Sequence, residues 1–294
     1  MPIVYLNGEY LPLEQASVSV LDRGFIFGDG VYEVVPAFSG VLFRLDQHLR
    51  RLDNSLAAVR IRNPLGHGAW REMLTTLLER NGGGDQSVYL QVTRGVAKRD
   101  HVLAEAVSPT VFAMSNPFSR KSRQPVTAIT HEDVRWKWCQ IKSIALLPSV
   151  LLRLAAQDEG AYEAILIRDG LLTEGAASNV FVVKDGIIKT PPHSDYLLPG
   201  VTRDLIVELL AAHKIPHAET KVTEAEVHTA DEIWLTSSTR EVVPVTQLNG
   251  KPVGSGKPGP MWQRVLAAYE SFRDAEVAAH LRERRPGAEP CPAV

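Results

Sequence analysis

The sequence is poor in cysteine, in long apolar runs and in unbalanced charge. It has two cysteines, Cys139 and Cys291, and Cys291 lies in a proline-rich tail, so we expect no structural disulfide and a cytoplasmic location. The 32 basic and 34 acidic side chains give a formal charge of −2, which provides no long-range attraction to nucleic acid or anionic lipid. No apolar run is long enough to cross a bilayer, and the first residues do not resemble a signal peptide. We therefore expect neither a nucleic-acid partner nor a membrane.

Signatures of several common enzyme classes are also missing. No G-x-G-x-x-G follows a predicted strand, and the chain has no Walker A motif, no G-x-S-x-G and no H-E-x-x-H. The two cysteines do not have the spacing of a zinc site, so we expect no metal. These absences argue against dinucleotide-binding, P-loop, hydrolase and zinc-protease chemistry.

The chain alternates short β-rich runs with helical periods. Strands are predicted over residues 3–6, 31–38, 41–43, 87–93, 110–114, 126–130 and 140–146, and two hairpins turn at Asp169-Gly170 and Asp185-Gly186. Helices are predicted over residues 45–61, 70–80, 148–159, 202–213 and 260–285. The fold class is α+β, with a small N-terminal domain (1–118), a linker (119–123), a larger C-terminal domain (124–285) and a disordered tail (286–294).

Lys142 is the first candidate for chemistry, because it stands inside the apolar run 140–146. Burial disfavours an ammonium ion, and a neutral amine is the form that adds to an aldehyde. The alternative is a strand lysine that points to solvent, which is the commoner case. This residue alone does not decide between the two.

Three further segments suit a planar or anionic ligand. Glu174 lies in a Gly/Ala-rich turn (173–179), where a carboxylate can approach a planar ring, although an exposed turn glutamate is the alternative. Residues 198–204 place a glycine before Thr202 at a helix start, where free amides bind phosphate, unless this is an ordinary cap. Residues 236–239 are four hydroxyl side chains after a predicted strand, and a plain polar loop would look the same.

Two loops carry groups that suit a carboxylate. Arg99 and His101 stand two residues apart, and an arginine can give a carboxylate two charge-assisted hydrogen bonds. The glycine-rich turn 27–30 leads into Tyr32, whose hydroxyl can donate to a carboxylate. A solvated basic loop and a hairpin turn packed on the core are the respective alternatives.

The order of these segments resembles that of the fold-type IV pyridoxal-phosphate enzymes, which include D-amino acid and branched-chain aminotransferases and aminodeoxychorismate lyase. The resemblance covers roughly residues 3 to 250 and is nearest to the bacterial D-amino acid (D-alanine) aminotransferases. The segments that carry it are FGDGVYEVV (27–35), YLQVTRG (89–95), DVRWKWCQIKSIALL (133–147), EGAYEAILIRDGLLTEGAASNVF (159–181), GVTRD (200–204) and LTSSTREVVPV (235–245). It implies a barrel-like β core in the larger domain, pyridoxal 5'-phosphate in the interdomain cleft, and a homodimer.

The resemblance also assigns roles by position. Lys142 corresponds to the lysine that forms a Schiff base with the cofactor and moves the Cα proton, and Glu174 to the acid that faces the pyridine nitrogen. The other cofactor-binding positions are Arg51, Ser178, Leu198, Val201, Thr202, Ser237 and Ser238; helical spacing alone does not choose Arg51 over Arg50. The substrate carboxylate is assigned to Tyr32, Arg99 and His101, and the loop with Arg99 and His101 comes from the partner subunit.

The implied reaction is transamination between a D-amino acid such as D-alanine and a 2-oxo acid such as 2-oxoglutarate or pyruvate. The Arg-x-His loop is the feature that favours D-amino acids over two alternatives on the same fold, a branched-chain L-aminotransferase and an (R)-amine transaminase. A non-catalytic binding protein is the third alternative. The chain departs from its close relatives at Ala176 and Ala177, where they carry serines.

Overall fold

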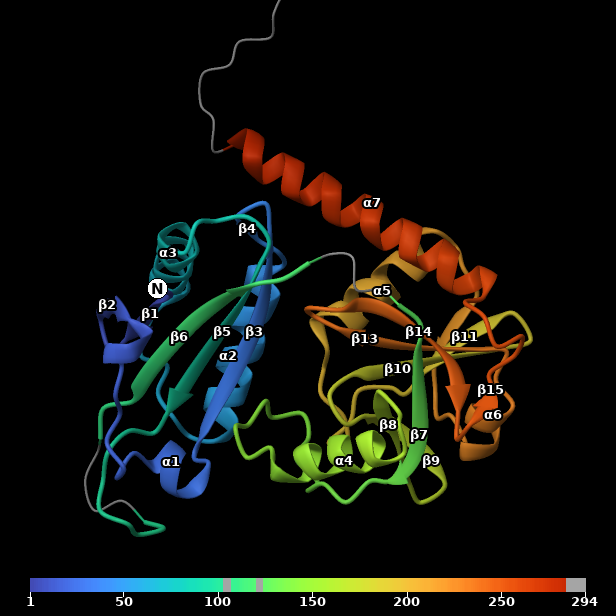
Figure 1. Ribbon diagram of the computed structural model, residues 1–294, viewed down its shortest axis with the longest axis horizontal. Helices are drawn as coiled ribbons and strands as arrows, with labels where there is room; N and C mark the ends of the chain where they lie inside the picture. The colour runs from blue at the N-terminus through green and yellow to red at the C-terminus, as the bar shows by residue number, and fades with distance from the viewer. Residues whose placement is uncertain (103–106, 120–123, 284–294) are drawn as a thin grey trace, which may run out of the picture.

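The computed structural model describes residues 1–102, 107–119 and 124–283. They form two β-sheets with helices packed against them (Figure 1), which confirms the predicted two-domain α+β class. The predicted boundaries of the domains remain predictions. Of the predicted linker only Ser119 is described, and the predicted tail lies outside the described residues.

The N-terminal sheet has six antiparallel strands in the order β2-β1-β6-β5-β3-β4. These are β1 (Ile3–Leu6), β2 (Glu9–Pro12), β3 (Gly30–Phe38), β4 (Val41–Leu42), β5 (Gln86–Thr93) and β6 (Thr110–Pro117). Buried and less buried residues alternate along β5, and the helices α2 (Leu45–Ala58) and α3 (His67–Arg80) bury their leucines in the same core. The short helix α1 (Arg23–Phe27) precedes β3.

The C-terminal sheet has nine strands and curls on itself. Its order is β12-β11-β10-β13-β14-β7-β8-β9, with β15 paired to β14. The strands are β7 (Val126–Glu132), β8 (Glu163–Arg168), β9 (Leu171–Gly175), β10 (Asn179–Lys184), β11 (Ile187–Thr190), β12 (His217–Glu219), β13 (Glu232–Ser237), β14 (Glu241–Leu248) and β15 (Lys251–Pro252). Both residues of the β8–β9 turn, Asp169 and Gly170, have positive φ, as do Asp185 and Gly186 of the next hairpin, which confirms the predicted turns.

Four helices accompany this sheet: α4 (Leu147–Asp158), α5 (Val201–Ala212), α6 (Glu224–His228) and α7 (Pro260–Glu283). The long helix α7 packs on α5 and reaches across to β4 of the other sheet (Figure 1). Residues 254–259 lead into α7, where the carboxylate of Glu232 accepts hydrogen bonds from the amides of Met261 and Trp262. None of the described helices has the length and apolar character needed to span a bilayer.

The prediction of a strand over residues 140–146 is wrong. This segment forms turns and a single isolated bridge between Ser143 and Val31. It lies along the end of β3, where the amide of Ile144 donates to Gly30 O and the amide of Tyr32 donates to Lys142 O. Of the apolar residues that suggested a strand, Ile141 packs on the N-terminal core, whereas Ala145 and Leu146 are exposed.

Candidate active site

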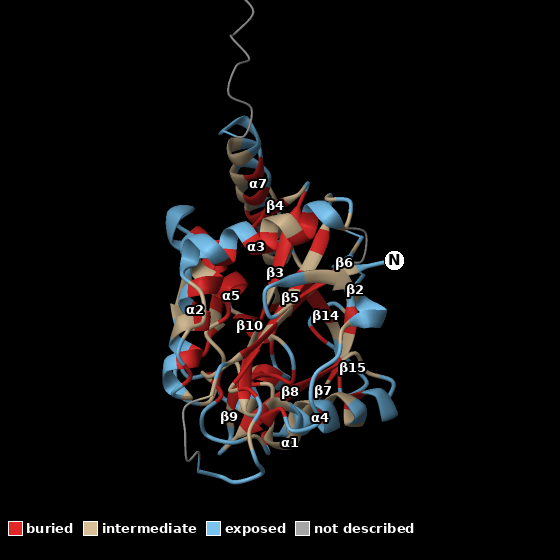
Figure 2. Ribbon diagram, turned by 90° about the vertical axis from the view of Figure 1, so that its left-hand side faces the viewer, coloured by how far each residue is buried: buried red, intermediate tan, exposed pale blue. Residues whose placement is uncertain are grey.

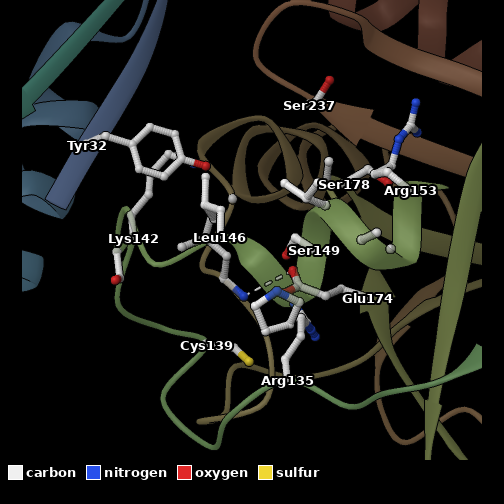
Figure 3. Close-up of a pocket in the computed structure, with 18 of the residues that line it drawn as sticks. Tyr32, Arg135, Cys139, Lys142, Leu146, Ser149, Arg153, Glu174, Ser178 and Ser237 are labelled. Carbon is white, nitrogen blue, oxygen red and sulfur yellow. Dashed lines mark hydrogen bonds and ion pairs between the residues drawn. The ribbon is translucent and has the colours of Figure 1, made fainter. Parts of the chain in front are cut away.

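A cavity of about 980 Å³ lies between the two sheets and is lined by both halves of the chain. Tyr32 and Arg51 come from the N-terminal half, and Figure 3 shows how Lys142 and Glu174 lie around the same space. Every cofactor-binding residue predicted from the sequence lines this cavity: Arg51, Lys142, Glu174, Ser178, Leu198, Val201, Thr202, Ser237 and Ser238.

Lys142 is held by its main chain at one side of the cavity. Its amide donates to Ser55 Oγ on α2 (3.1 Å), and its carbonyl accepts from the amide of Tyr32 on β3 (2.9 Å). The amine Nζ lies 4.2 Å from the centre of the Tyr32 ring. Two elements of the N-terminal half therefore fix the position of Lys142, the only lysine that lines the cavity among the described residues.

Arg51 is positioned by a buried carboxylate. Its Nε and Nη2 donate to the two oxygens of Glu33 (2.7 and 2.8 Å), while its Nη1 donates to Pro199 O (2.9 Å). Burial raises the pKa of Glu33, but the charge and hydrogen bonds of Arg51, together with the hydrogen bond to His48, outweigh burial and hold that pKa well below its ordinary value. Arg50 is exposed, so the structure selects Arg51 over Arg50 as the arginine at the cavity.

Glu174 closes another side of the cavity at the end of β9. One oxygen accepts from Nη1 of Arg135, and the other accepts from Asn179 Nδ2 (3.1 Å) and from the amide of Leu198 (3.1 Å). Burial raises the pKa of Glu174 to about 7, and Arg135 opposes that rise only in part because Asp133 takes two of its other N–H groups. The carboxyl group can therefore gain or lose a proton near neutral pH.

The start of α5 supplies anion-binding groups. Its N-cap is Gly200, and among the described residues no side chain caps the first turn, which includes Val201 and Thr202. A Cβ on Gly200 would lie 1.9 Å from Asn179 Oδ1, so the close approach of these chains requires glycine.

Hydroxyl groups at the end of β13 face the same cavity. Ser237 and Ser238 line it, and so does Thr236, whose buried Oγ1 has no hydrogen-bond partner among the described residues. A buried hydroxyl without a partner at a cavity wall fits a site made for a polar ligand. Amides, hydroxyls and Arg51 together fit a phosphate group.

Ser178 and the two alanines before it form the turn from β9 to β10. The hydroxyl of Ser178 donates to Glu163 Oε2 (2.9 Å), so this group is already bonded to β8. Ala176 is buried against α4 and β8, and its amide donates to Ala164 O. The departure at Ala176 and Ala177 therefore leaves this wall of the cavity apolar.

Arg99 and His101 do not line the cavity within this chain. Both side chains are exposed, and each lies 5.5 Å from the ring centre of Phe27, measured from the guanidinium carbon and from the imidazole centre. Tyr32, the third residue predicted to bind the substrate carboxylate, does line the cavity. One chain alone does not bring the predicted trio together.

Comparison with known proteins identifies the family of this chain. The family described as Amino-transferase class IV matches residues 30–248. The chain belongs to the class IV aminotransferase family. It is 40% identical over 278 residues to a D-alanine aminotransferase of Bacillus licheniformis, covering 94% of this chain and 98% of that protein. It is 39% identical to a D-alanine aminotransferase of Listeria monocytogenes, covering 88% of this chain and 91% of that one.

A solved structure of a branched-chain enzyme shares the fold. The branched-chain amino acid aminotransferase from Escherichia coli superposes with a TM-score of 0.85 at 25% identity, over 92% of this chain and 94% of that one. For this class IV aminotransferase the cavity fits the predicted cofactor: a phosphate end at α5, an acid at Glu174 for a ring nitrogen, and an amine at Lys142 for an aldehyde.

Several residues of this class IV aminotransferase site were not singled out from the sequence: Glu33, His48, Ser55, Asp133, Arg135 and Asn179. For some of them a signal existed. Glu33 shares strand parity with the buried Val31 and Val35, so an acid on the apolar face already indicated a buried partner. His48 and Ser55 share a helix face with Arg51. The position of Arg135 depends on tertiary contacts, and we see no local signal for it.

Proposed function

We infer that this chain is a pyridoxal-phosphate-dependent aminotransferase that moves the amino group of D-amino acids such as D-alanine to 2-oxo acids such as 2-oxoglutarate. The observation that carries this proposal is one cavity lined by Lys142, by Glu174 and by the start of α5. The relatives named D-alanine aminotransferase support the substrate class.

Each of the chain's own groups has a definite task in this proposal. When bound, the cofactor delocalises the electron pair left on Cα after deprotonation. The amine of Lys142 would take the proton from Cα and deliver it to the carbon on the other side of the amino nitrogen. Glu174, with its pKa raised to about 7, holds a proton at the ring nitrogen. Arg51, Thr202 and the first amides of α5 bind the phosphate, and the hydroxyl of Tyr32 donates to the substrate carboxylate.

The substrate site is completed by a second copy of the chain. Helix α4 exposes the apolar residues Leu147, Val150, Leu151 and Leu154, which share one helix face. Phe25 of α1 and the indoles of Trp136 and Trp138 are exposed as well, and α1 and α4 both lie at the lower edge of the molecule in Figures 1 and 2. An apolar surface of this kind fits a homodimer interface, across which Arg99 and His101 reach the partner's cavity.

Mixed dimers test this arrangement. Lys142→Ala and Arg99→Ala are each expected to be nearly inactive as homodimers, but a heterodimer of the two contains one intact site if Arg99 acts across the interface. Random pairing then restores roughly a quarter of the sites. If co-expression restores no activity, the shared site is wrong.

A donor screen tests the reaction. Paired D- and L-amino acids are offered with 2-oxoglutarate, and L-leucine and (R)-1-phenylethylamine are included because the structural neighbours include branched-chain enzymes. We expect D-alanine to be used in preference to L-alanine, L-leucine and (R)-1-phenylethylamine, and Arg99→Ala to reduce its use about a hundredfold or more. A preference for L-leucine or the amine that survives Arg99→Ala contradicts D-specificity. A non-catalytic protein would show no half-reaction with any amine.

The cytoplasm remains the predicted compartment.

A further inference from the structure

Two arginines pack on one tyrosine at the side of the cavity away from Lys142. The guanidinium carbons of Arg153 on α4 and Arg240 lie 4.4 and 4.1 Å from the ring centre of Tyr162. Arg153 and Tyr162 line the cavity, whereas Arg240 is outside that lining and ends the turn 238–240, which follows Ser237 of β13. In Figure 3, Arg153 lies beside Ser178 and Ser237, across the site from Tyr32 and Lys142.

The charges around this tyrosine do not balance. Arg153 forms an ion pair with the buried Glu163 (3.2 Å), but among the described residues no carboxylate lies within ion-pair distance of Arg240. The other arginines of the cavity are neutralised, Arg51 by Glu33 and Arg135 by Asp133 and Glu174. Among these arginines, Arg240 alone is therefore left without a carboxylate in the described part of the chain, and a bound anion would balance its charge.

Stacking also sets the direction of the guanidinium groups. A guanidinium packed on an aromatic face keeps its N–H groups free at the edge, where a planar carboxylate can accept two hydrogen bonds. On the proposed function, the carboxylate next to the reacting carbon is held by Tyr32 with Arg99 and His101. A carboxylate at Arg240 must then belong to the far end of the substrate.

We propose that Arg240, with Arg153 and the ring of Tyr162, binds the distal carboxylate of dicarboxylic substrates. This inference rests on the proposed function and deepens it: the site favours five-carbon dicarboxylates such as D-glutamate and 2-oxoglutarate over D-alanine and pyruvate. Ala176 and Ala177 also line the cavity and offer an apolar wall for the methylene chain.

Single-turnover half-reactions of the holoenzyme test the proposal. Pyridoxal-form protein is mixed with D-glutamate or D-alanine, and pyridoxamine-form protein with 2-oxoglutarate or pyruvate, and the cofactor absorbance is followed. Arg240→Gln should slow the dicarboxylic substrates about 10- to 100-fold more than the short ones, because a charge-assisted pair is lost. Glutarate should inhibit the wild type more strongly than butyrate, and the variant should lose that difference.

Two further variants act as controls. Arg264→Ala removes an exposed arginine of α7 outside the cavity. It should change neither the rate ratio of dicarboxylic to short substrates nor the ratio of inhibition by glutarate and butyrate. Arg153→Lys keeps a cation beside Glu163, so that the buried carboxylate is not left unpaired, and should weaken the discrimination less than Arg240→Gln does.

The outcomes are distinct. If Arg240→Gln changes the ratio of half-reaction rates between dicarboxylic and short substrates by at least about fivefold, the distal subsite is supported, and a smaller change overturns it. An equal loss with all substrates, accompanied by weaker cofactor retention on dialysis, assigns Arg240 to the phosphate and also overturns the proposal. If the wild type reacts with none of the four compounds, the proposed function fails; if it reacts and only the ratio is unmoved, the subsite alone fails.

Discussion

Glu33 and Glu174 are both buried and both bonded to an arginine beside the cavity, yet their pKa values move in opposite directions. Glu33 receives two hydrogen bonds from Arg51 and one from His48, which together outweigh burial and lower its pKa. Glu174 shares Arg135 with Asp133, so burial prevails and its pKa rises to about 7. The same residue pair thus serves two purposes, according to whether the arginine serves one carboxylate or is shared between two.

The difference in pKa separates a carboxylate that only positions its arginine from a carboxyl group that can exchange a proton. A carboxylate that stays ionised at every working pH fixes Arg51 and nothing more, whereas a carboxyl group that titrates near neutral pH can share its proton with a ligand. The variants below should therefore separate into two classes: changes at Glu33 act on stability and cofactor affinity, and changes at Glu174 act on turnover.

The largest effect is expected for Glu174→Gln. Glutamine keeps the shape of the side chain but cannot hold the ring nitrogen protonated, so the single-turnover rate with D-alanine should fall by about 10²- to 10⁴-fold. Cofactor should still bind and give the visible absorbance. Glu33→Gln is the buried control, and its rate with saturating cofactor should fall much less. Equal losses in the two variants would contradict the division of roles.

The next effect concerns stability. Glu33→Gln leaves the buried guanidinium of Arg51 without its counter-charge, which should lower the free energy of unfolding by about 3–5 kcal/mol in urea titrations. Glu226 provides a partly exposed comparison, since Glu226→Gln keeps the capping box of α6 and loses only the pair with Lys189. That change should cost less than about 1 kcal/mol. A loss of similar size at both positions would contradict the special role of Glu33.

The pH dependence of stability should differ in sign between the two residues. Glu33 has a lowered pKa, so its contribution is present above its unfolded value of 4.5 and is lost as the pH falls below it. Glu174 has a raised pKa, so the folded state loses stability as the pH rises from 4.5 to about 7, by about 3 kcal/mol, and loses no more above that. Urea titrations of cofactor-free wild type, Glu33→Gln and Glu174→Gln from pH 4 to 8 measure this. Parallel curves for wild type and Glu174→Gln between pH 4.5 and 7 would refute the assignment.

Much of the fold could be predicted from the sequence wherever a local pattern exists. The two Asp-Gly hairpins, the leucine stripe of α2 and the helix starting after Gly200 were predicted because each depends on residues within a few positions of one another. The resemblance in segment order then predicted which residues line the cavity.

What could not be predicted depends on contacts across the chain. Residues 140–146 have the composition of a strand, but their partners are β3 and α2, more than 80 positions earlier, and these contacts hold the segment as turns. Which oxygens Arg135 binds, and hence the direction of the Glu174 pKa, also follows from tertiary geometry. The position of Arg99 and His101 beside Phe27, outside this chain's cavity, is a third such case.

The smallest effect is expected from a change at Asp133, which shares the hydrogen bonds and the charge of Arg135 with Glu174. Asp133 accepts from Nε and Nη2 of Arg135 (2.8 and 3.0 Å), and its charge also raises the pKa of Glu174. Asp133→Asn removes that charge and leaves more of the Arg135 charge for Glu174, so the pKa of Glu174 should fall by about one unit or less. The pH at which stability stops declining then moves below 7. Asp169→Asn is the control, because Asp169 lies in the exposed β8–β9 turn and asparagine also accepts a positive φ. This variant should leave the pH at which stability stops declining unchanged. If Asp133→Asn moves that pH upward, the sharing of Arg135 does not explain why Glu174 and Glu33 differ.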